Sequence, residues 1–517
     1  MPDASASADP RAMEAQAPAA KSGRLLLTGS LMAATFMQAL DTTIANVALP
    51  HMEGSLSATQ DQITWILTSY IVAAAIMTPL TGWLAGRFGR KRVLLISVAG
   101  FVLSSALCGI AISLPQMVIY RLLQGVSGAA LVPISQAVLL DTYPTSKHGQ
   151  AMAMWGLGVT LAPVVGPVLG GWLTDDYSWR WVFYINVPIG ILAFFGLLTS
   201  VKDSPRIKRN FDFFGFGVLS VGVGALQMML DRGEIKDWFN SPEIIVEAAL
   251  AGFGFYFFVV RMVTAKHPFL SLALFKDRNF VTGNMFIFVV GIILFATLVL
   301  VPPLFQGLMN YPVITTGLIM APRGVGTMLS MVLVGRVAGK IDPRILIGFG
   351  FALSALSLWQ MMGFDLQMDE WPVIWSGLTQ GFGVGFAYVS LSSVSFATLP
   401  PQYRAEGTAF FNLMRNLGSS IGISAVQALL TENTQTMHSS LSRFISPYNP
   451  ALQGFDLHST QTLAQLNGLI TSQAAMVAYN DDFKIMMILS LLTIPFLIFL
   501  RVKAPRPGEK PEIVALE

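Results

Sequence analysis

The stretch VLLISVAGFVLSSALCGIAIS, residues 93–113, carries no charged side chain. As an α-helix it would be about 30 Å long, which matches the hydrocarbon core of a bilayer. Similar runs recur along the whole chain, in which 53% of the 517 residues are hydrophobic and only 12% are charged. The alternating pattern of barrel strands is absent, and an isolated apolar segment satisfies its own backbone in lipid only as a helix. The stretch therefore decides the fold class, an all-α polytopic membrane protein.

Fourteen apolar runs are long enough to span a bilayer, at about 20 residues each. They lie at 25–46, 62–84, 93–113, 116–139, 150–172, 182–201, 212–231, 243–264, 280–302, 314–336, 345–364, 372–395, 408–430 and 483–502. The sequence thus predicts fourteen transmembrane helices.

The distribution of Lys and Arg indicates how these spans are oriented. With the amino terminus in the cytosol, most basic residues fall in cytosolic segments, and the outer segments hold only Arg180, Arg232, Lys236, Arg443 and Lys484. This asymmetry follows the positive-inside rule and predicts that both termini are cytosolic. Because the basic residues are scattered over many short loops, they indicate topology anchors and no nucleic-acid partner.

Cysteine, histidine and glycine patterns argue against several classes of protein. The single cysteine, Cys108, excludes an intrachain disulfide framework and a cysteine-rich metal site. The five histidines have no metal-ligand spacing, and no GxxxxGK[ST] phosphate-binding loop is present. We therefore expect no metal, no cofactor and no enzyme activity.

An internal repeat relates the two ends of the chain. The motif GWLAGR at 82–87 closes the second predicted span, and GRVAGK at 335–340 closes the tenth. The pair Gln124-Gly125 in the fourth span is matched by Gln380-Gly381 in the twelfth. Duplicated six-helix halves are how many secondary transporters enclose a central cavity.

The repeat predicts a division of the chain into five parts. We expect a disordered cytosolic tail at 1–23, a six-helix bundle at 24–201, an inserted helix pair with linkers at 202–279, a second six-helix bundle at 280–502, and a cytosolic tail at 503–517. Within the second bundle, residues 431–482 form the longest outer loop, and spaced apolar residues between 452 and 479 predict an amphipathic helix there.

Five motifs follow one another in an order that resembles the major facilitator superfamily, and in particular its fourteen-helix drug:proton antiporters of the EmrB type. They are LDTTIANVALP at 40–50, the basic loop at 82–92, RLLQG at 121–125, the Gly/Pro-rich segment 158–171 and WRWVFYINVPIG at 179–190. The resemblance covers nearly the whole chain after residue 24.

This resemblance implies export of small amphipathic compounds from the bacterial inner membrane in exchange for protons, driven by the proton motive force. It also implies a periplasmic adaptor and an outer-membrane channel as partners, and the loop 431–482 is a candidate for docking them. Two rivals stay open: a proton-linked importer of a sugar or organic acid, and a non-transporting receptor or scaffold.

The basic loop departs from the family pattern at one position. Gly82, Gly86, Arg87 and Arg90 belong to the inner-gate motif that the resemblance implies, but the family usually has an acidic residue where this chain has Gly86. Asp141, after the fourth span, is a possible substitute partner for the basic residues.

Asp41 is the first candidate for proton coupling. A charge in the middle of a membrane helix costs about 2.5–3.5 kcal/mol, so its presence needs a reason. Gln38 lies three residues earlier on the same helical face. The functional interpretation is a carboxylate that loads and unloads a proton or meets a cationic substrate. The alternative is a helix-end cap near the outer surface, because Pro50 closes the span.

Three arginines lie inside predicted spans. Arg121 has Gln124 on the same face, and the resemblance implies that this arginine takes part in proton coupling; the alternative is a structural pair between spans one and four. Arg323 and Arg415 lie in the second half, with Asn412 one turn before Arg415. They would hold anionic substrate groups, pair with Asp41 across the cavity, or bind backbone carbonyls at helix breaks.

The fifth predicted span is rich in helix-breaking and small residues. Pro163 and Pro167 remove helix hydrogen bonds, and Gly166, Gly170 and Gly171 permit close helix approach. We interpret the cluster as a gating segment, which the resemblance links to limiting proton leak. Ordinary transmembrane packing is the alternative for any single glycine.

Overall fold

The structure is a computed structural model that describes residues 21–144, 147–204, 206, 210–338, 340–445, 449, 452 and 459–501. Within these ranges the regular secondary structure is helical, and the β-structure found is one isolated bridge between Ala338 and Ile341. The predicted tails lie outside the described residues, except that Lys21 already begins the first helix. The prediction of an all-α fold is confirmed.

Helices occur at every predicted span. In the first half they are α2 (Lys21–Ser55), α4 (Trp65–Met77) with α5 (Leu80–Phe88), α6 (Arg90–Ile110), α7 (Leu114–Gly128) with α8 (Leu131–Thr142), α9 (His148–Asp176), and α10 (Trp181–Tyr184) with α11 (Asn186–Ser200). The inserted pair is α12 (Phe213–Arg232) and α13 (Pro242–Thr264). The second half contains the short α14 (Leu272–Lys276), then α15 (Arg278–Pro303), α16 (Val313–Val337), α17 (Pro343–Met361), α18 (Trp371–Ala397), α19 (Arg404–Ser442) and α20 (Thr460–Thr493).

Ten helical segments in the described part of the chain are long and apolar enough to cross a membrane. An eleventh is the pair α4 and α5, which bends by 56° at its break. The remaining long helices, α2, α18 and α19, are not among them; α2 and α19 carry the polar residues Asp41 and Arg415 inside the protein. These segments together are consistent with the fourteen predicted spans.

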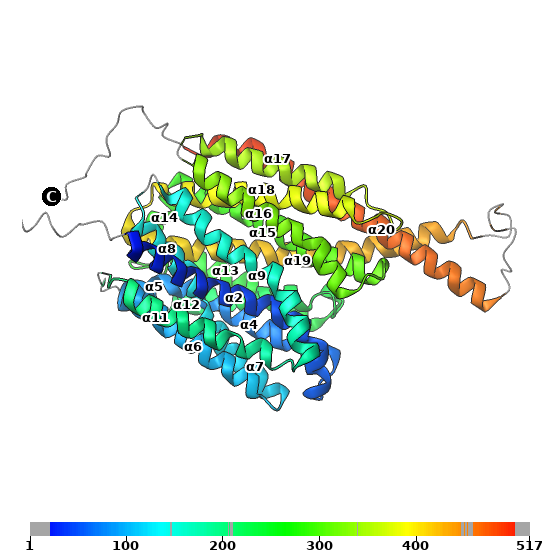
Figure 1. Cartoon of the computed structure of the whole chain (residues 1–517), viewed down its shortest axis with the longest axis horizontal. Coiled ribbons are helices and arrows are strands. Elements are labelled where there is room, and N and C mark those ends of the chain that lie inside the picture. Colours follow the sequence, from blue (N-terminus) through cyan, green and yellow to red (C-terminus); the bar gives the residue numbers. More distant parts are fainter. Residues whose placement is uncertain are drawn as a thin grey trace, which may run out of the picture.

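Both halves use the same helix pairings. In the first half α2 packs on α9 and α11, α4 on α7, and α6 on α7 and α11. In the second half α15 packs on α19 and α20, α16 on α18, and α17 on α18 and α20. Each of these pairings in one half has its equivalent in the other, which is the arrangement that the internal repeat predicts. Figure 1 shows the first half in blue to cyan and the second half in green to orange.

The repeated motif lies where the two halves meet. Helix α5 packs on α19, and α16 packs on α9. A Cβ added at Gly82 would lie 2.6 Å from the backbone of Glu406, and one added at Gly335 would lie 3.2 Å from the Ala153 side chain. The first glycine of each motif copy therefore permits close contact between the halves.

The inserted pair packs on the first half and on α19. Helices α12 and α13 contact each other at Gly222 and Gly254, where an added Cβ on Gly254 would lie 2.6 Å from Gly222. Asp231 of α12 accepts a hydrogen bond from Thr68 of α4, and Ser420 of α19 donates to Gln227 at 2.8 Å.

The last two helices extend well beyond the bundle (Figure 1). Helix α19 continues to Ser442 and α20 begins at Thr460, so most of the predicted loop 431–482 is helical. The two helices pack on each other, and Leu466 of α20 is buried outside the predicted span. The helices continue beyond the predicted spans because they pack on each other, and a prediction from one segment of sequence does not include that contact. Residues 453–458, at the start of the predicted amphipathic helix, lie outside the described residues.

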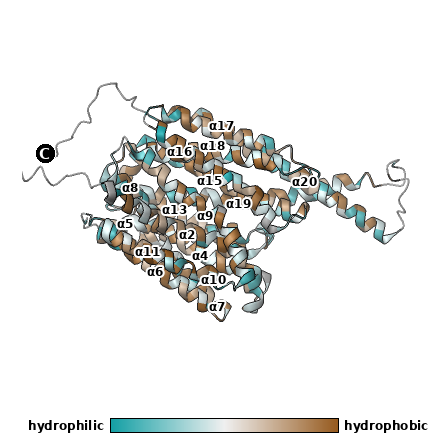
Figure 2. Ribbon diagram, viewed as in Figure 1, coloured by the Kyte–Doolittle hydropathy of each residue, from teal (hydrophilic) through white to brown (hydrophobic). Residues whose placement is uncertain are grey.

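Hydrophobic residues predominate along the bundle, and hydrophilic residues gather at the helix ends (Figure 2). Many large apolar side chains on the outer helices are exposed, among them Leu192 at 74% and Phe253 at 63%. Apolar side chains on the outside of a bundle are expected where the solvent is lipid.

Candidate functional site

Asp41 lies at the centre of a fully buried polar cluster in the first half. Its carboxylate accepts hydrogen bonds from Arg121 at 2.6 Å, Gln124 at 2.9 Å and Asn186 at 2.8 Å. The residue is 0% exposed and Arg121 is 1% exposed. The cluster joins α2 to α7 and to α11, helices that the bundle packing brings together. A charged pair this deep needs further hydrogen bonds, and Gln124 and Asn186 provide them to the second oxygen of Asp41. The Nε of Arg121 has no hydrogen-bond partner among the described residues.

The surroundings of the cluster hold Arg121 in place. Its guanidinium lies 4.9 Å from the ring centre of Phe183 and 5.3 Å from that of Tyr70, and it also donates to Gln124 at 2.8 Å. Asn186 is anchored in turn by Ser105 at 3.0 Å. The aromatic rings exclude water and favour the cation. Proton transfer to Asp41 would thus remove the counter-charge of Arg121 in a dry site.

The glycines of α9 set the position of α2 next to Asp41. A Cβ added at Gly166 would overlap the side chain of Thr43, and one added at Gly170 would lie 2.9 Å from Ile44. Gly171, in contrast, faces open space. Pro163 and Pro167 lie inside α9, which stays one helix from His148 to Asp176. Gln38, one turn before Asp41, is half-buried.

A second polar network crosses between the halves. Asn412 of α19 donates to Gln136 of α8 at 2.7 Å, and Gln136 donates to the Tyr388 hydroxyl of α18 at 3.1 Å. Arg415 donates to the same hydroxyl at 3.4 Å, and Trp155 of α9 stacks on the Tyr388 ring. The predicted residues Asn412 and Arg415 therefore lie at the interface between the halves, and neither pairs with Asp41.

Arg323 is a buried cation among neutral groups. It is 8% exposed and donates to the backbone carbonyl of Leu294 at 2.8 Å and to the Thr297 hydroxyl at 2.9 Å. Gln380 also donates to Thr297, at 3.2 Å. Within the described residues no carboxylate forms an ion pair with Arg323. The side chain thus binds a backbone carbonyl, but Leu294 lies inside the continuous helix α15 and not at the helix break that the sequence analysis expected.

Asp141 links the two halves at the end where the motif loops lie. It forms ion pairs with Arg90 of α6 and with Arg404 of α19, the latter at 2.7 Å. Arg404 also donates to the carbonyl of Leu140 at 3.1 Å, and Arg90 to that of Pro401 at 3.2 Å. This geometry fits the expectation that Asp141 substitutes for the missing acid.

Gly86 and Arg87 of the motif lie outside this network, and Gly82 contacts Glu406 instead. Arg87 is exposed, and a Cβ at Gly86 would meet nothing within 4 Å.

Several residues of these networks were missed as site residues in the sequence, among them Arg404, Asn186, Gln136 and Tyr388. Asn186 lies inside the motif 179–190, and Gln136 is a polar residue in the apolar run 116–139, so both carried a signal. Tyr388 carried none, because its hydroxyl becomes informative only once Gln136 and Arg415 are known to meet it.

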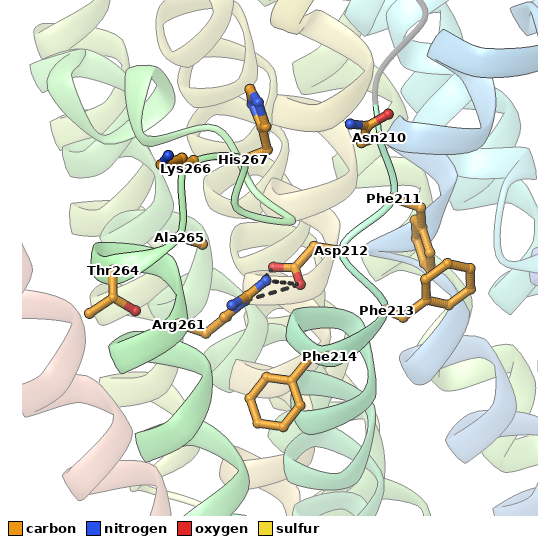
Figure 3. Close-up of a pocket in the computed structure, with 10 residues that line it drawn as sticks. All are labelled: Asn210, Phe211, Asp212, Phe213, Phe214, Arg261, Thr264, Ala265, Lys266 and His267. Atoms are coloured by element: carbon orange, nitrogen blue, oxygen red, sulfur yellow. Dashed lines mark hydrogen bonds and ion pairs between the residues drawn. The ribbon is translucent and has the colours of Figure 1, made fainter.

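The inserted pair contains a separate hollow of about 610 Å³ (Figure 3). The hollow lies where α12 begins and α13 ends. There Arg261 of α13 forms an ion pair with Asp212 at 3.1 Å. Asp212 also accepts from the backbone N–H of Gly215 at 3.1 Å, which caps α12. None of the predicted site residues lines this hollow, and we interpret its ion pair as a structural tie between the two helices.

Comparison with known proteins gives a consistent result. The family model of the Major Facilitator Superfamily matches residues 31–423. "Multidrug export protein EmrB" of Haemophilus influenzae is 39% identical over 470 residues, which are 89% of this chain and 92% of that protein. "Fatty acid resistance protein FarB" of Neisseria gonorrhoeae is 37% identical over 91% of this chain and 94% of its own length. Among solved structures, a double Trp mutant of XylE superposes with a TM-score of 0.60 at 15% identity, covering 94% of this chain and 97% of that one.

Proposed function

The chain belongs to the major facilitator superfamily of membrane transporters, and we propose that it is a proton-coupled antiporter that exports small amphipathic compounds across the bacterial inner membrane. Its relatives are named for multidrug export and fatty acid resistance, and their sequences align with about nine-tenths of this chain. Export is the direction that these names support.

The observation that carries the proposal is the buried cluster around Asp41. In this conformation Asp41 is paired with Arg121 and bonded to Gln124 and Asn186, so it is held as a carboxylate. Protonation would end the ion pair and leave Arg121 uncompensated in a dry site, which is unfavourable unless the helices rearrange. The charge state of Asp41 is in this way coupled to the packing of α2 against α7 and α11.

An alternating transporter also needs a closure between its halves that can open, and the ion pairs of Asp141 are our candidate for it. Its ion pairs with Arg90 and Arg404 join α6 and α8 of the first half to α19 of the second. With the topology predicted by the basic residues, this junction lies at the cytosolic end, so it would hold the cytosolic side closed. Opening to the cytosol requires these pairs to break.

The energy available is sufficient for useful export. One charge crossing 100 mV gains about 2.3 kcal/mol, which supports a gradient of about 50-fold for one proton exchanged per neutral substrate.

Arg323 is our candidate for the group that receives acidic substrates. It is a cation inside the second half whose partners are a carbonyl and a hydroxyl. A substrate carboxylate would be a stronger partner than either, because hydrogen bonds between charged groups are about twice as strong as neutral ones. The similarity to a fatty acid resistance protein supports amphipathic acids as one substrate class.

The projecting ends of α19 and α20 are our candidate for docking a periplasmic adaptor that leads to an outer-membrane channel. Exposed apolar side chains continue along α20 beyond the predicted span, with Leu463 at 43% and Leu469 at 63% exposure. A Leu463→Ser and Leu469→Ser double variant should lose crosslinking to the adaptor, whereas Gln465→Ser on the same exposed helix should not. Equal crosslinking of both variants would remove this assignment.

The main experiment is transport by purified protein in liposomes with an imposed pH gradient. Wild type should move protons only when substrate is present, and Asp41→Asn should abolish this coupling. Asp369→Asn, an exposed acid outside the cluster, should behave as wild type. A coupled Asp41→Asn variant would refute the role of Asp41.

The same experiment separates the rival functions. A proton-linked importer of a sugar or organic acid would move substrate and proton in the same direction. A receptor or scaffold would show no substrate-dependent proton movement at all. In cells, accumulation of a fluorescent cationic dye should rise when Asp41→Asn replaces the wild type, as expected for an exporter only.

A further inference from the structure

Asp482 lies on the packing face of α20, in a place where apolar residues are expected. The buried residues Tyr479, Phe483, Met486 and Ser490 follow helical spacing around it, and they form the side of α20 that meets the rest of the second half. Asp482 is 0% exposed, so protein atoms cover it completely.

Neither carboxylate oxygen of Asp482 has a hydrogen-bond partner among the described residues. This contrasts with Asp41, which is equally buried but accepts three hydrogen bonds, one of them from Arg121. Asp41 lies in the first half and has three hydrogen-bond donors, whereas Asp482 lies in the second half and has none among the described residues.

The residues on either side of Asp482 hold this part of α20 against the end of α17. Phe483, the next residue, packs edge-on against Phe364 just beyond α17, with ring centres 6.0 Å apart. Asn480 donates to the carbonyl of Phe364 at 3.2 Å, which fixes α20 against the end of α17.

The ionisable groups that flank Asp482 on α20 itself are Tyr479, Asp481 and Lys484. Lys484 is exposed, whereas Asp482 is fully buried and neither of its oxygens has a hydrogen-bond partner among the described residues, so this lysine does not pair with it. The elements packed against α20 carry their ionisable groups elsewhere. Arg278 of α15 lies by Phe499, Arg344 of α17 by Leu500, Arg415 of α19 by Tyr388, and His438 of α19 bonds to Asn467.

An ionised carboxylate without partners in such a place is strongly disfavoured, whereas a neutral carboxylic acid is tolerated. We propose that Asp482 is a proton-binding site, separate from Asp41, that is occupied in this conformation and empties only when α20 separates from α17. The inference does not depend on the proposed function, because it concerns the charge of one buried group.

The direct test is the infrared spectrum of the full-length protein in lipid. A protonated carboxylic acid has a carbonyl stretching band that a carboxylate lacks. We expect this band at neutral pH in wild type and its loss in Asp482→Asn, while Asp41→Asn and Asp481→Asn retain it. An unchanged band in Asp482→Asn, or no such band in wild type, would overturn the proposal.

A second measurement keeps Asp482 in place, in case the Asn variant does not fold. Met486 is 1% exposed and lies one turn along the same face, so a Met486→Cys protein in a Cys108→Ala background reports opening of α20 through its rate of thiol labelling. The labelling rate at each pH is divided by that of the unfolded protein, which corrects for ionisation of the thiol. Because opening of α20 would release one proton, the corrected rate should rise up to tenfold for each unit of increase in pH. A corrected rate independent of pH would refute the coupling.

Discussion

Replacing Asp41 by Asn is the most informative perturbation of the buried cluster. The change keeps the size of the side chain but removes its charge and places an N–H donor where Arg121 and Asn186 also donate. Arg121, 1% exposed, is then a buried cation without a counter-ion. Breaking a buried ion pair by removing one partner costs about 3–5 kcal/mol. Arg121→Gln should cost about as much, because it leaves the Asp41 carboxylate unpaired.

The two changes together should cost much less than their sum. With both charges removed, neutral amides remain that bond to each other and to Gln124. For residues in direct contact the coupling reaches about 3 kcal/mol, so the double variant should fall short of the sum by about that amount. Equilibrium unfolding in mixed detergent micelles, followed by tryptophan fluorescence, measures the three values.

The exposed acid variant Asp369→Asn provides the control and should unfold as wild type does. Additive losses in the double variant would mean that Asp41 and Arg121 do not act as a pair, and the proposed link between proton binding and helix packing would be refuted.

Three further outcomes test other parts of the molecule. Gly166→Ala should lower the melting temperature because the new methyl group overlaps Thr43, whereas Gly171→Ala, in open space, should not. Asp141→Asn should free the two halves at the end where the motif loops lie and raise thiol labelling of cysteines placed between them; unchanged labelling would argue against a lock. Arg323→Gln should reduce transport of fatty acids in liposomes more than transport of neutral drugs, and equal loss of both would exclude a role in choosing acids.

The helical fold was accessible from the sequence because spanning a membrane is a local property, and the fourteen predicted spans are consistent with the structure. A run such as 93–113 must be a helix in lipid whatever surrounds it. The halves were accessible too, since the copies at 82–87 and 335–340 record the repeat directly. The loop 431–482 was predicted less well, because continued helix there depends on α19 packing on α20.

The chemistry of single residues was only half determined by the sequence. The cost of a charge in a membrane singles out Asp41 and Arg121 without any structure. Helical spacing also places Gln124 on the face of Arg121. Helical spacing does not say which helix the face with Arg121 and Gln124 contacts. The partners that α7 and α11 provide for Asp41 could therefore not be predicted.

Tertiary structure alone decided which charges are compensated. Asp41 lies in a predicted span and Asp482 in the predicted outer loop, yet both are fully buried. Asp41 meets an arginine and two amides, whereas neither carboxylate oxygen of Asp482 has a hydrogen-bond partner among the described residues. The physical reason is that hydropathy and helical period are properties of one segment, whereas compensation of a buried charge depends on side chains that neighbouring helices bring from elsewhere in the chain.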